Sequence, residues 1–247
     1  MNVLIADKLA AAAVSDLENA GFTVSNRPDL GADDLPDAIG GVDVLVVRST
    51  KVTAATFDAG TNLALVVRAG AGVNTIDLEA AGNSGVFVAN CPGKNADAVA
   101  ELAIGLVIAA DRRVPAGMRS LADGKWEKKE YQKSAGLLGR TMGILGYGTI
   151  GRGVARRAAA LGMRVLAWSR SLTPDAAEAD GIGYAKTPRE LAEAADTVSV
   201  HVAGTAETKH LIDASFLEAM KDEAILVNTS RGDVVDSAAL KDAIRAK

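Results

Sequence analysis

"GILGYGTIGRGVARRAAALG", residues 143–162, contains the glycine pattern that decides the fold. Gly146, Gly148 and Gly151 form G-x-G-x-x-G between an apolar run and an alanine-rich stretch. This strand–loop–helix context distinguishes a dinucleotide-binding loop from an ordinary glycine turn. The first glycine permits a tight turn, the second a close approach to a pyrophosphate, and the third close packing of helix on strand. The N–H groups at the start of the helix would then face the phosphates.

Apolar runs that alternate with helical stretches extend from this loop in both directions. They occupy residues 2–6, 22–25, 42–48, 63–72 and 85–90 before the loop, and 164–168, 197–202 and 224–228 after it. Short apolar runs that are rich in β-branched residues and separated by helices predict βα units in parallel sheets. The sequence therefore predicts an α/β fold of two Rossmann-like lobes, residues 1–92 and 93–247, with a last helix that reaches Lys247.

The composition argues against several classes of protein. The 247 residues carry a net charge of −4 with acidic and basic residues intermixed, so a nucleic-acid partner is not expected. The single cysteine, Cys91, excludes an intrachain disulfide and suits a reducing cytoplasm. No apolar run approaches the ~20 residues of a membrane helix, and the N-terminus enters a strand without the charged region of a signal peptide. We expect a cytoplasmic protein with neither a membrane partner nor a metal site.

The middle of the chain departs from this alternation. Residues 96–114 predict a long helix that is apolar nearly all round and that Asn95 can cap. Such a helix is buried on several sides, either between lobes or at a subunit contact. The polar segment 121–139 follows, with Trp126 and Tyr131 among lysines and glutamates. Two interpretations of this segment stay open: a solvated connection, or an arm that packs on a partner subunit.

The residues after the run 164–168 bear on the choice of cofactor. An NAD site usually has an acidic residue about 20 positions beyond the glycine loop, where it binds the 2′-hydroxyl of the ribose. This chain has Ser169 and Arg170 there instead. Since a guanidinium pairs well with a phosphate, the two residues favour NADP over NAD. The alternative is that Arg170 only lies over the adenine, which would leave the choice of cofactor relaxed.

Seven blocks of sequence resemble the D-isomer-specific 2-hydroxyacid dehydrogenases, and most of all the phosphoglycerate dehydrogenase branch of that family. In the family's order, the blocks are "VVRSTKVT" (46–53), "VVRAGAGVNTID" (66–77), "NCPGKNADAVAELAIGL" (90–106), "ADGKWEKKEY" (122–131), "GRTMGILGYGTIGRGVARRAAALGMRVLAWSR" (139–170), "VSVHVAGTAETKHLID" (198–213) and "LVNTSRGDVVD" (226–236). The resemblance implies a flavodoxin-like substrate lobe in residues 1–92 and an NAD(P)-binding Rossmann domain in residues 93–247.

The resemblance also implies roles in substrate binding. In this family a hydride passes between a nicotinamide and C2 of a 2-hydroxy or 2-oxo acid. Arg231 would hold the carboxylate of the acid and polarise its carbonyl, a task that suits a guanidinium fork. Arg48 and Ser49 would meet a substrate phosphate, which favours 3-phosphoglycerate and a role in serine biosynthesis. The alternatives are a surface ion pair for Arg231 and an ion pair at the edge of the core for Arg48. Backbone N–H groups for the carboxylate would come from Ala69, Gly70, Ala71 and Gly72.

The cofactor contacts that the resemblance implies lie on several loops. They are Ala71, Gly146, Gly148, Thr149, Ile150, Gly151, Ser169, Arg170, His201, Val202, Thr229, Ser230 and Arg231. One position departs from the family, because Ala203 stands where a proline is usual. We therefore expect the loop after the run 197–202 to be looser than in relatives.

The acid–base pair of the family is not found in this sequence. The family uses a histidine for proton transfer, with a glutamate that orients it, some tens of positions beyond the arginine; a histidine suits this task near neutral pH. His201 and His210 both lie outside that context. We expect a longer natural protein, an incomplete first lobe, and a Rossmann domain without its last strand and return helix. We also expect little or no turnover from residues 1–247 alone.

Two other functions remain open at this stage. One is an NADPH-dependent glyoxylate or hydroxypyruvate reductase, which Ser169 and Arg170 favour. The other is a non-catalytic dinucleotide-sensing protein, since the family includes corepressors that keep the fold. The resemblance further implies a homodimer or a larger homo-oligomer, built around the long helix after Asn95.

Overall fold

A computed structural model describes residues 1–246, so the predicted end of the last helix at Lys247 lies outside the described residues. The chain divides into two compact units, Met1–Asn95 and Ala96–Lys247. Each unit contains one five-stranded sheet in which all strands are parallel. The predicted α/β fold with two parallel sheets is therefore confirmed. None of the helices within residues 1–246 is both long and apolar enough to cross a membrane.

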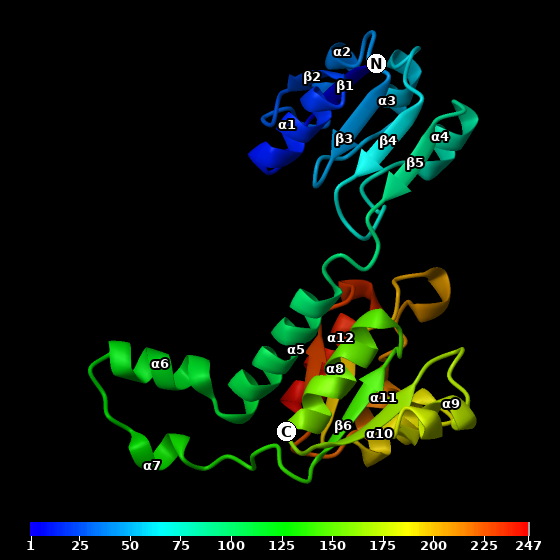
Figure 1. The fold of residues 1–247 in the computed structure, drawn as a ribbon. Coiled ribbons are helices and arrows are strands. Elements are labelled where there is room, and N and C mark those ends of the chain that lie inside the picture. The colour runs from blue at the N-terminus through cyan, green and yellow to red at the C-terminus, as the bar shows by residue number, and fades with distance from the viewer. Residues whose placement is uncertain (247) are drawn as a thin grey trace. The chain divides into compact units, whose positions relative to one another are not determined.

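The first unit has the strand order β2-β1-β3-β4-β5, which is the order of flavodoxin-like sheets. Its strands are β1 (Asn2–Ile5), β2 (Thr23–Asn26), β3 (Val44–Val47), β4 (Leu65–Arg68) and β5 (Phe87–Asn90). Its helices are α1 (Ala11–Asn19), α2 (Leu35–Ala38), α3 (Ala54–Ala59) and α4 (Leu78–Asn83). Buried residues of α2, α3 and α4 pack on one face of the sheet, and α1 packs on the other (Figure 1). Because both faces are covered, β3 is buried along its whole length.

The second unit has the strand order β10-β9-β6-β7-β8. Its strands are β6 (Thr141–Leu145), β7 (Arg164–Trp168), β8 (Gly183–Tyr184), β9 (Thr197–Val200) and β10 (Ile225–Asn228). Its helices are α5 (Ala96–Asp111), α6 (Val114–Ala122), α7 (Lys128–Tyr131), α8 (Thr149–Ala160), α9 (Pro174–Ala179), α10 (Pro188–Ala194), α11 (Ala214–Ala219) and α12 (Ser237–Arg245), with short 3-10 turns η1 (Ala206–Thr208) and η2 (Gly232–Val234). The chain adds strands on one side of β6 and then on the other, so the order reverses between β6 and β9. Ligands of open α/β sheets bind at such a reversal, beyond the carboxyl ends of the strands.

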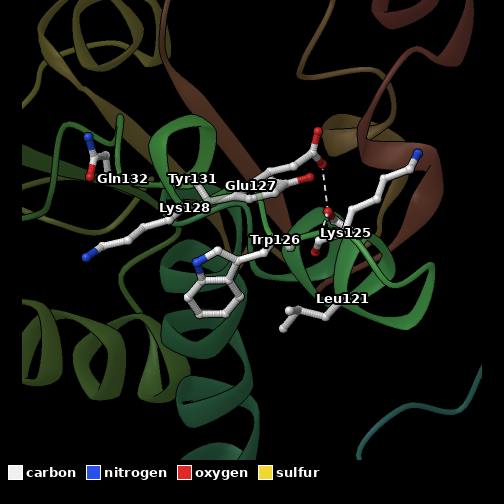
Figure 2. Close-up of a pocket in the computed structure, with 9 residues that line it drawn as sticks. Leu121, Lys125, Trp126, Glu127, Lys128, Tyr131 and Gln132 are labelled. Atoms are coloured by element: carbon white, nitrogen blue, oxygen red, sulfur yellow. Dashed lines mark hydrogen bonds between the residues drawn. The ribbon is translucent and has the colours of Figure 1, made fainter.

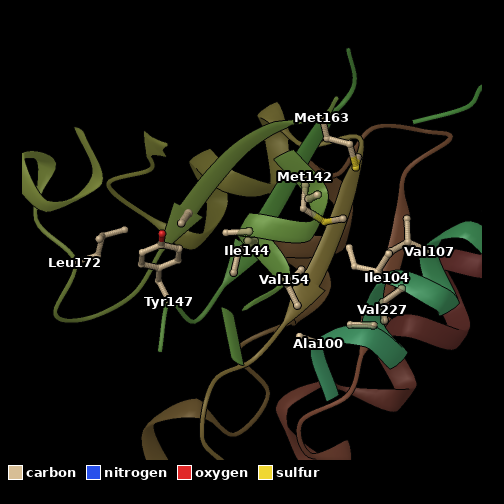
Figure 3. Packing of buried hydrophobic residues seen from close by; sticks show 14 of the residues in the cluster. Ala100, Ile104, Val107, Met142, Ile144, Tyr147, Val154, Met163, Leu172 and Val227 are labelled. Atoms are coloured by element: carbon tan, nitrogen blue, oxygen red, sulfur yellow. The ribbon is translucent and has the colours of Figure 1, made fainter. Parts of the chain in front are cut away.

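Small and aliphatic residues hold the helices of the second unit against its sheet. α5 and α8 cover one face, and α10, α11 and α12 cover the other (Figure 1). Figure 3 shows Ile104 and Val107 of α5 beside Val227 of β10. The contact between α5 and α8 is close, because a Cβ on Gly153 would lie 3.1 Å from Cβ of Ala100. Tight packing of this kind explains why alanine and glycine, rather than aromatic residues, dominate the sequence.

The apolar helix α5 is buried on one side only. Its buried positions include Ala100, Ala103 and Val107, whereas Leu102 is 56% exposed and Leu106 is 41% exposed. The predicted burial of the other side, between lobes or at a subunit contact, stays a prediction. The exposed side is a long apolar surface.

Residues 112–139 form an arm with helices α6 and α7 (Figure 1), and this arm includes the segment 121–139, for which two interpretations were open. Buried Asp111, at the end of α5, fixes its base. The Asp111 carboxylate accepts a hydrogen bond from the Gly136 N–H at 3.1 Å and one from Arg140 Nη1 at 3.3 Å. At the start of the arm, Arg113 has a left-handed backbone with φ of 52° and lies over the ring of Tyr131. The segment is thus more ordered than a plain connection.

Candidate functional site

The glycine loop lies at the strand reversal, between β6 and α8. Gly146 has φ of +105°, and a Cβ there would lie 2.6 Å from the carbonyl carbon of His201. A Cβ on Gly151 would collide with the carbonyl oxygen of Gly146. Gly148 differs, because a Cβ there would meet nothing within 4 Å. Two glycines are therefore required by the protein's own packing, and the third leaves open space in front of the loop.

The first turn of α8 faces this open space with unpaired N–H groups. Gly148 is the residue before the helix, and no side chain caps the helix start. The first N–H groups of a helix have no partner within it, and they carry the positive end of the helix dipole. The predicted contacts Thr149 and Ile150 are the first two residues of α8. The arrangement suits a phosphate group.

Tyr147, the middle residue of the loop, connects the loop to neighbouring elements and also lines the cavity that adjoins the loop. It is buried, and the guanidinium of Arg152 lies 4.6 Å from the centre of its ring. Arg152 also forms an ion pair with Asp180, which follows α9. Burial raises the pKa of Tyr147, and its hydrogen bond to Asp180 raises the pKa further. Sequence analysis missed this anchor, because nothing in the pattern signals a contact with a residue more than 30 positions away.

A cavity of about 190 Å³ adjoins the loop at the carboxyl ends of β6, β7 and β9. It brings together six of the predicted cofactor contacts: Gly146, Gly148, Ser169, Arg170, His201 and Val202. It also contains Ala203, the position at which a proline was expected, together with Thr205 and Thr208, which sequence analysis did not single out. Predicted contacts far apart in the sequence thus meet in one cavity.

His201 lies in this cavity as a neutral side chain. Its Nε2 is 2.8 Å from Oγ of the buried Ser199, and its backbone N–H donates to the carbonyl of Leu145 at 2.7 Å. Burial lowers the pKa of His201 to about 4. At neutral pH the ring therefore has no proton to give up as an imidazolium. The other histidine, His210, is exposed and lies 3.8 Å from the carboxylate of Asp236.

The turn after β10 holds Thr229, Ser230 and Arg231. Asn228 organises it, because its Nδ2 donates to the carbonyl of Arg231 at 2.8 Å and its Oδ1 accepts from the Ser230 N–H at 2.9 Å. The guanidinium of Arg231 donates to the Ser230 carbonyl at 3.0 Å and forms no ion pair with any carboxylate of residues 1–246. The alternative of a surface ion pair is therefore not seen. Oγ1 of Thr229 is buried and has no hydrogen-bond partner within the described chain.

In the first unit, the loop 69–72 directs its carbonyl groups into the protein. The carbonyls of residues 70, 71 and 72 accept hydrogen bonds from the Cys91 N–H (3.0 Å), Asn90 Nδ2 (2.7 Å) and Arg68 Nη1 (2.7 Å). Of the N–H groups predicted to bind a carboxylate, those of Ala69 and Gly70 already donate to the carbonyls of Val47 (2.7 Å) and Arg68 (2.8 Å). The N–H groups of residues 71–73 have no acceptor among residues 1–246. Three neighbouring donors remain available, which is the arrangement that a carboxylate needs.

Arg48 and Ser49 lie just past β3, in a turn that Asp7 holds. Oδ2 of Asp7 accepts from the backbone N–H groups of Arg48 (2.7 Å), Ser49 (3.0 Å) and Thr50 (3.0 Å). Burial alone would raise the pKa of Asp7, but these three donors outweigh it and lower the pKa. Arg48 is exposed and forms no ion pair with any described residue, contrary to the alternative reading. Sequence analysis missed Asp7, which comes more than 40 residues before the turn.

The residues of the second unit fit a dinucleotide. The open space at Gly148, the uncapped start of α8 and the unpartnered Oγ1 of Thr229 are features that a bound phosphate and ribose would satisfy. Ser169 and Arg170 occupy the place of the usual carboxylate at the end of β7. In residues 1–246, no group of three or more His, Cys, Asp or Glu side chains is placed to hold a metal ion.

Comparisons with known proteins agree with this geometry. Residues 104–247 match the sequence profile described as "D-isomer specific 2-hydroxyacid dehydrogenase, NAD binding domain". The chain is 39% identical over 247 residues to D-3-phosphoglycerate dehydrogenase of Archaeoglobus fulgidus, covering 100% of this chain and 46% of the relative. It is 43% identical over 217 residues to hydroxypyruvate reductase of Thermotoga maritima, covering 87% of this chain and 69% of the relative.

Solved structures give the same result. The crystal structure of the TT0316 protein of Thermus thermophilus superposes with a TM-score of 0.89 at 34% identity, covering 99% of this chain and 78% of that chain. The chain spans about half the length of the D-3-phosphoglycerate dehydrogenases that it matches, 46% in the archaeal example.

Proposed function

This chain belongs to the D-isomer-specific 2-hydroxyacid dehydrogenase family. We propose that it forms part of an oxidoreductase that acts on a 2-hydroxy or 2-oxo acid, with 3-phosphoglycerate as the first candidate substrate. The observation that carries the proposal is the cavity beside the glycine loop, which gathers residues from the ends of β6, β7 and β9. A nicotinamide cofactor, when bound, supplies the hydride chemistry. The chain's own residues bind and orient the two reactants.

The proposed cofactor contacts follow from the second unit. The start of α8 and Gly148 would hold the pyrophosphate, and Ser169 and Arg170 would face the adenosine ribose. Thr229 would use its buried hydroxyl. Since a guanidinium favours a phosphate over a hydroxyl, we place NADP ahead of NAD.

The proposed substrate contacts comprise one set in each unit. In the second unit, Arg231 would bind the carboxylate and polarise the carbonyl oxygen, because its guanidinium is not engaged by an acidic side chain of residues 1–246. In the first unit, the N–H groups of residues 71–73 offer donors to a carboxylate. A substrate phosphate would bind the side chains of Arg48 and Ser49 rather than their backbone N–H groups, which Asp7 already occupies.

Calorimetric titrations test the cofactor part of the proposal. The chain should bind NADP and NAD. Gly148→Ala should lower the affinity for both cofactors about ten-fold or more, because the new methyl group would fill the open space proposed for the pyrophosphate. Gly82→Ala, in α4, is the matched control, since a Cβ there also meets nothing within 4 Å. Equal binding by the two variants would rule out the glycine loop as the cofactor site.

The substrate part is tested with phosphorylated and unphosphorylated acids. Arg48→Ala should weaken the binding of 3-phosphoglycerate but not that of glycerate. Arg231→Ala should weaken the binding of both acids. A hydroxypyruvate or glyoxylate reductase is the second candidate, favoured by Ser169 and Arg170 and by the 43% identity to a hydroxypyruvate reductase. The reductase would be selected if hydroxypyruvate bound tightly and if Arg48→Ala left the affinity for hydroxypyruvate unchanged.

We further propose that a second copy of this chain covers α5 and the arm. Met118 is 66% exposed and Trp126 is 78% exposed, and Leu102 and Leu106 extend this apolar surface along α5. The arm also holds a pocket of about 300 Å³ around Leu121 and Trp126 (Figure 2). Exposed apolar side chains gathered in this way are typical of interfaces.

Sedimentation analysis tests this assembly. Leu106→Glu should convert a dimer into monomers, because it places a charge in the apolar surface. Leu78→Glu is the matched control, since Leu78 is similarly exposed (51%) but lies on α4. A wild-type chain that stays monomeric at micromolar concentration would contradict the proposal.

A further inference from the structure

A second cavity of the second unit lies between α8 and the turn that precedes β8. We call it the α8–β8 cavity; residues of α8, residues 163–165 and residues 180–183 line it, and its volume is about 530 Å³, within the usual range for ligand sites. Arg164, the first residue of β7, belongs to this lining, whereas Ser169 of the cofactor cavity follows the last residue of β7. The two cavities therefore adjoin opposite ends of one strand, and Tyr147 lines both.

Apolar side chains form much of the lining of the α8–β8 cavity. They are Ala155 and Ala159 of α8, Met163 and Val165 around the start of β7, and Ile182 in the turn before β8. Ala155 and Met163 are buried members of the hydrophobic cluster that holds α8 on the sheet, so packing fixes this part of the lining. An apolar lining favours a ligand with an apolar body over a bare ion.

Two arginines of the lining carry charges that the chain leaves largely uncompensated. Arg164 is exposed and forms no ion pair with any carboxylate of residues 1–246. Arg156 reaches the carboxylate of Asp97 only at 3.9 Å, and Arg157 already engages that carboxylate at 3.2 Å. Both guanidinium groups of the lining are therefore available to an anion.

The acidic residue of the lining, Asp180, is already paired. It forms an ion pair with Arg152, whose guanidinium lies 4.6 Å from the centre of the Tyr147 ring. This pairing offsets the negative charge that would otherwise repel an anion. Arg156 and Arg164 therefore give the α8–β8 cavity a positive charge.

We propose that the α8–β8 cavity is a second ligand site, which binds a phosphomonoester whose organic body is apolar. Two guanidinium groups suit a phosphate that carries nearly two negative charges, and the apolar lining suits the body of the ligand. This site is separate from the proposed cofactor site, and it does not depend on the choice between NAD and NADP.

The probe for this site is 1-naphthyl phosphate, which combines a phosphate with an apolar ring system. In calorimetric titrations of the 247-residue chain at low ionic strength, this probe should bind. Inorganic phosphate and 1-naphthol, which have one of the two features each, should bind at least about ten-fold more weakly. Added salt should lower the affinity for the probe, because it screens exposed charges.

Variants of the lining locate the bound probe. Arg164→Gln should lower the affinity about three- to ten-fold, as expected for the loss of one charge at an exposed site. Ala159→Leu keeps both charges but fills the cavity, so it should lower the affinity about ten-fold or more. Both residues are exposed, so neither variant should disturb the core.

Arg27→Gln and Ala160→Leu are the matched controls. Arg27 is an exposed arginine of the first unit, and Ala160 is the exposed neighbour of Ala159 on α8, outside the lining of the cavity. Both controls should leave the affinity for the probe within about two-fold. Gly148→Ala, which fills the space proposed for the pyrophosphate, should also leave this affinity unchanged.

Three results would overturn the inference. They are no binding of the probe, equal losses in the variants and their controls, or a loss in Gly148→Ala that Ala159→Leu does not share. The last result would place the probe in the cofactor cavity. A chain that binds NADP but not the probe would leave the proposed function intact and remove only this second site.

Discussion

Asp7 shows how one half-buried carboxylate shapes a loop that sequence analysis assigned to the substrate. Its Oδ2 accepts three backbone N–H bonds from residues 48–50. Hydrogen bonds to a charged group are stronger than neutral ones, so Asp7→Asn should destabilise the first unit by about 1–3 kcal/mol. Hydrogen exchange at the amides of residues 48–50 should quicken in the same variant.

The pH dependence of this contribution has a definite sign. The pKa of Asp7 is lowered in the folded protein, so its stabilising effect is present above the unfolded value of about 4 and is lost as the pH falls through the folded pKa. The difference between wild type and Asp7→Asn should therefore be largest near pH 7 and shrink in acid. Asp58→Asn, an exposed carboxylate on α3, is the control. Similar behaviour of the two variants would refute a special role for Asp7.

The second prediction at the scale of one residue concerns His201. Its pKa of about 4 reflects burial next to Ser199. The folded protein therefore binds a proton at this ring less readily than the unfolded chain, so stability should rise with pH between about 4 and 6.5. His201→Asn should flatten this dependence. In a His210→Gln background, the NMR signals of the remaining histidine should titrate with a midpoint near pH 4. A midpoint near 6.5 would contradict the burial argument.

At the scale of elements, the third prediction concerns the contacts of Tyr147 in the glycine loop. Tyr147 connects the loop to Arg152 of α8 and to Asp180 after α9. Tyr147→Phe removes one hydrogen bond and keeps the ring, so the free energy of unfolding should fall by about 1 kcal/mol. Affinity for 5′-AMP should fall about two- to five-fold, because a loop held less firmly loses more freedom on binding.

Tyr184→Phe is the matched control for this anchor. Tyr184 lies in β8 and packs against the same hydrophobic cluster. This variant should leave nucleotide affinity unchanged. If Tyr147→Phe behaved in the same way, the anchor would stabilise the fold without positioning the loop.

The elements also show where sequence reasoning succeeds and where it stops. The strands were predictable, because runs such as 44–47 are apolar throughout and both faces of each sheet are covered. The glycine loop was predictable, because its conformation requires glycine at Gly146. The arm was left open because its order depends on Asp111, which joins Gly136 and Arg140 across 25 and 29 residues. Such contacts leave no periodic signal in the sequence.

The same limit applies to the site at the scale of the whole molecule. The residues proposed to bind the ligands, such as Arg231 and Ser169, follow strand ends and could be named from the pattern. Tyr147 could not, because its contact with Asp180 arises only when the strands and helices of the second unit come together.

The last prediction concerns the independence of the two units. Each of the four hydrophobic core clusters contains residues of one unit only, so a fragment of residues 96–247 should fold without residues 1–95. Every residue that lines the cofactor cavity lies in this fragment. Its affinity for 5′-AMP should therefore stay within about two-fold of that of the whole chain.

The complete dinucleotide should behave differently from 5′-AMP in this fragment. Ala71, proposed to contact the cofactor, belongs to the first unit. Removal of the first unit should therefore lower the affinity for NADP and leave the affinity for 5′-AMP unchanged. Calorimetric titration of both ligands with both proteins measures the contrast. An equal loss of affinity for the two ligands would mean that the second unit needs the first in order to fold correctly. If the fragment kept its full affinity for both ligands, Ala71 would not belong to the cofactor site, and the second unit would be a complete binding module.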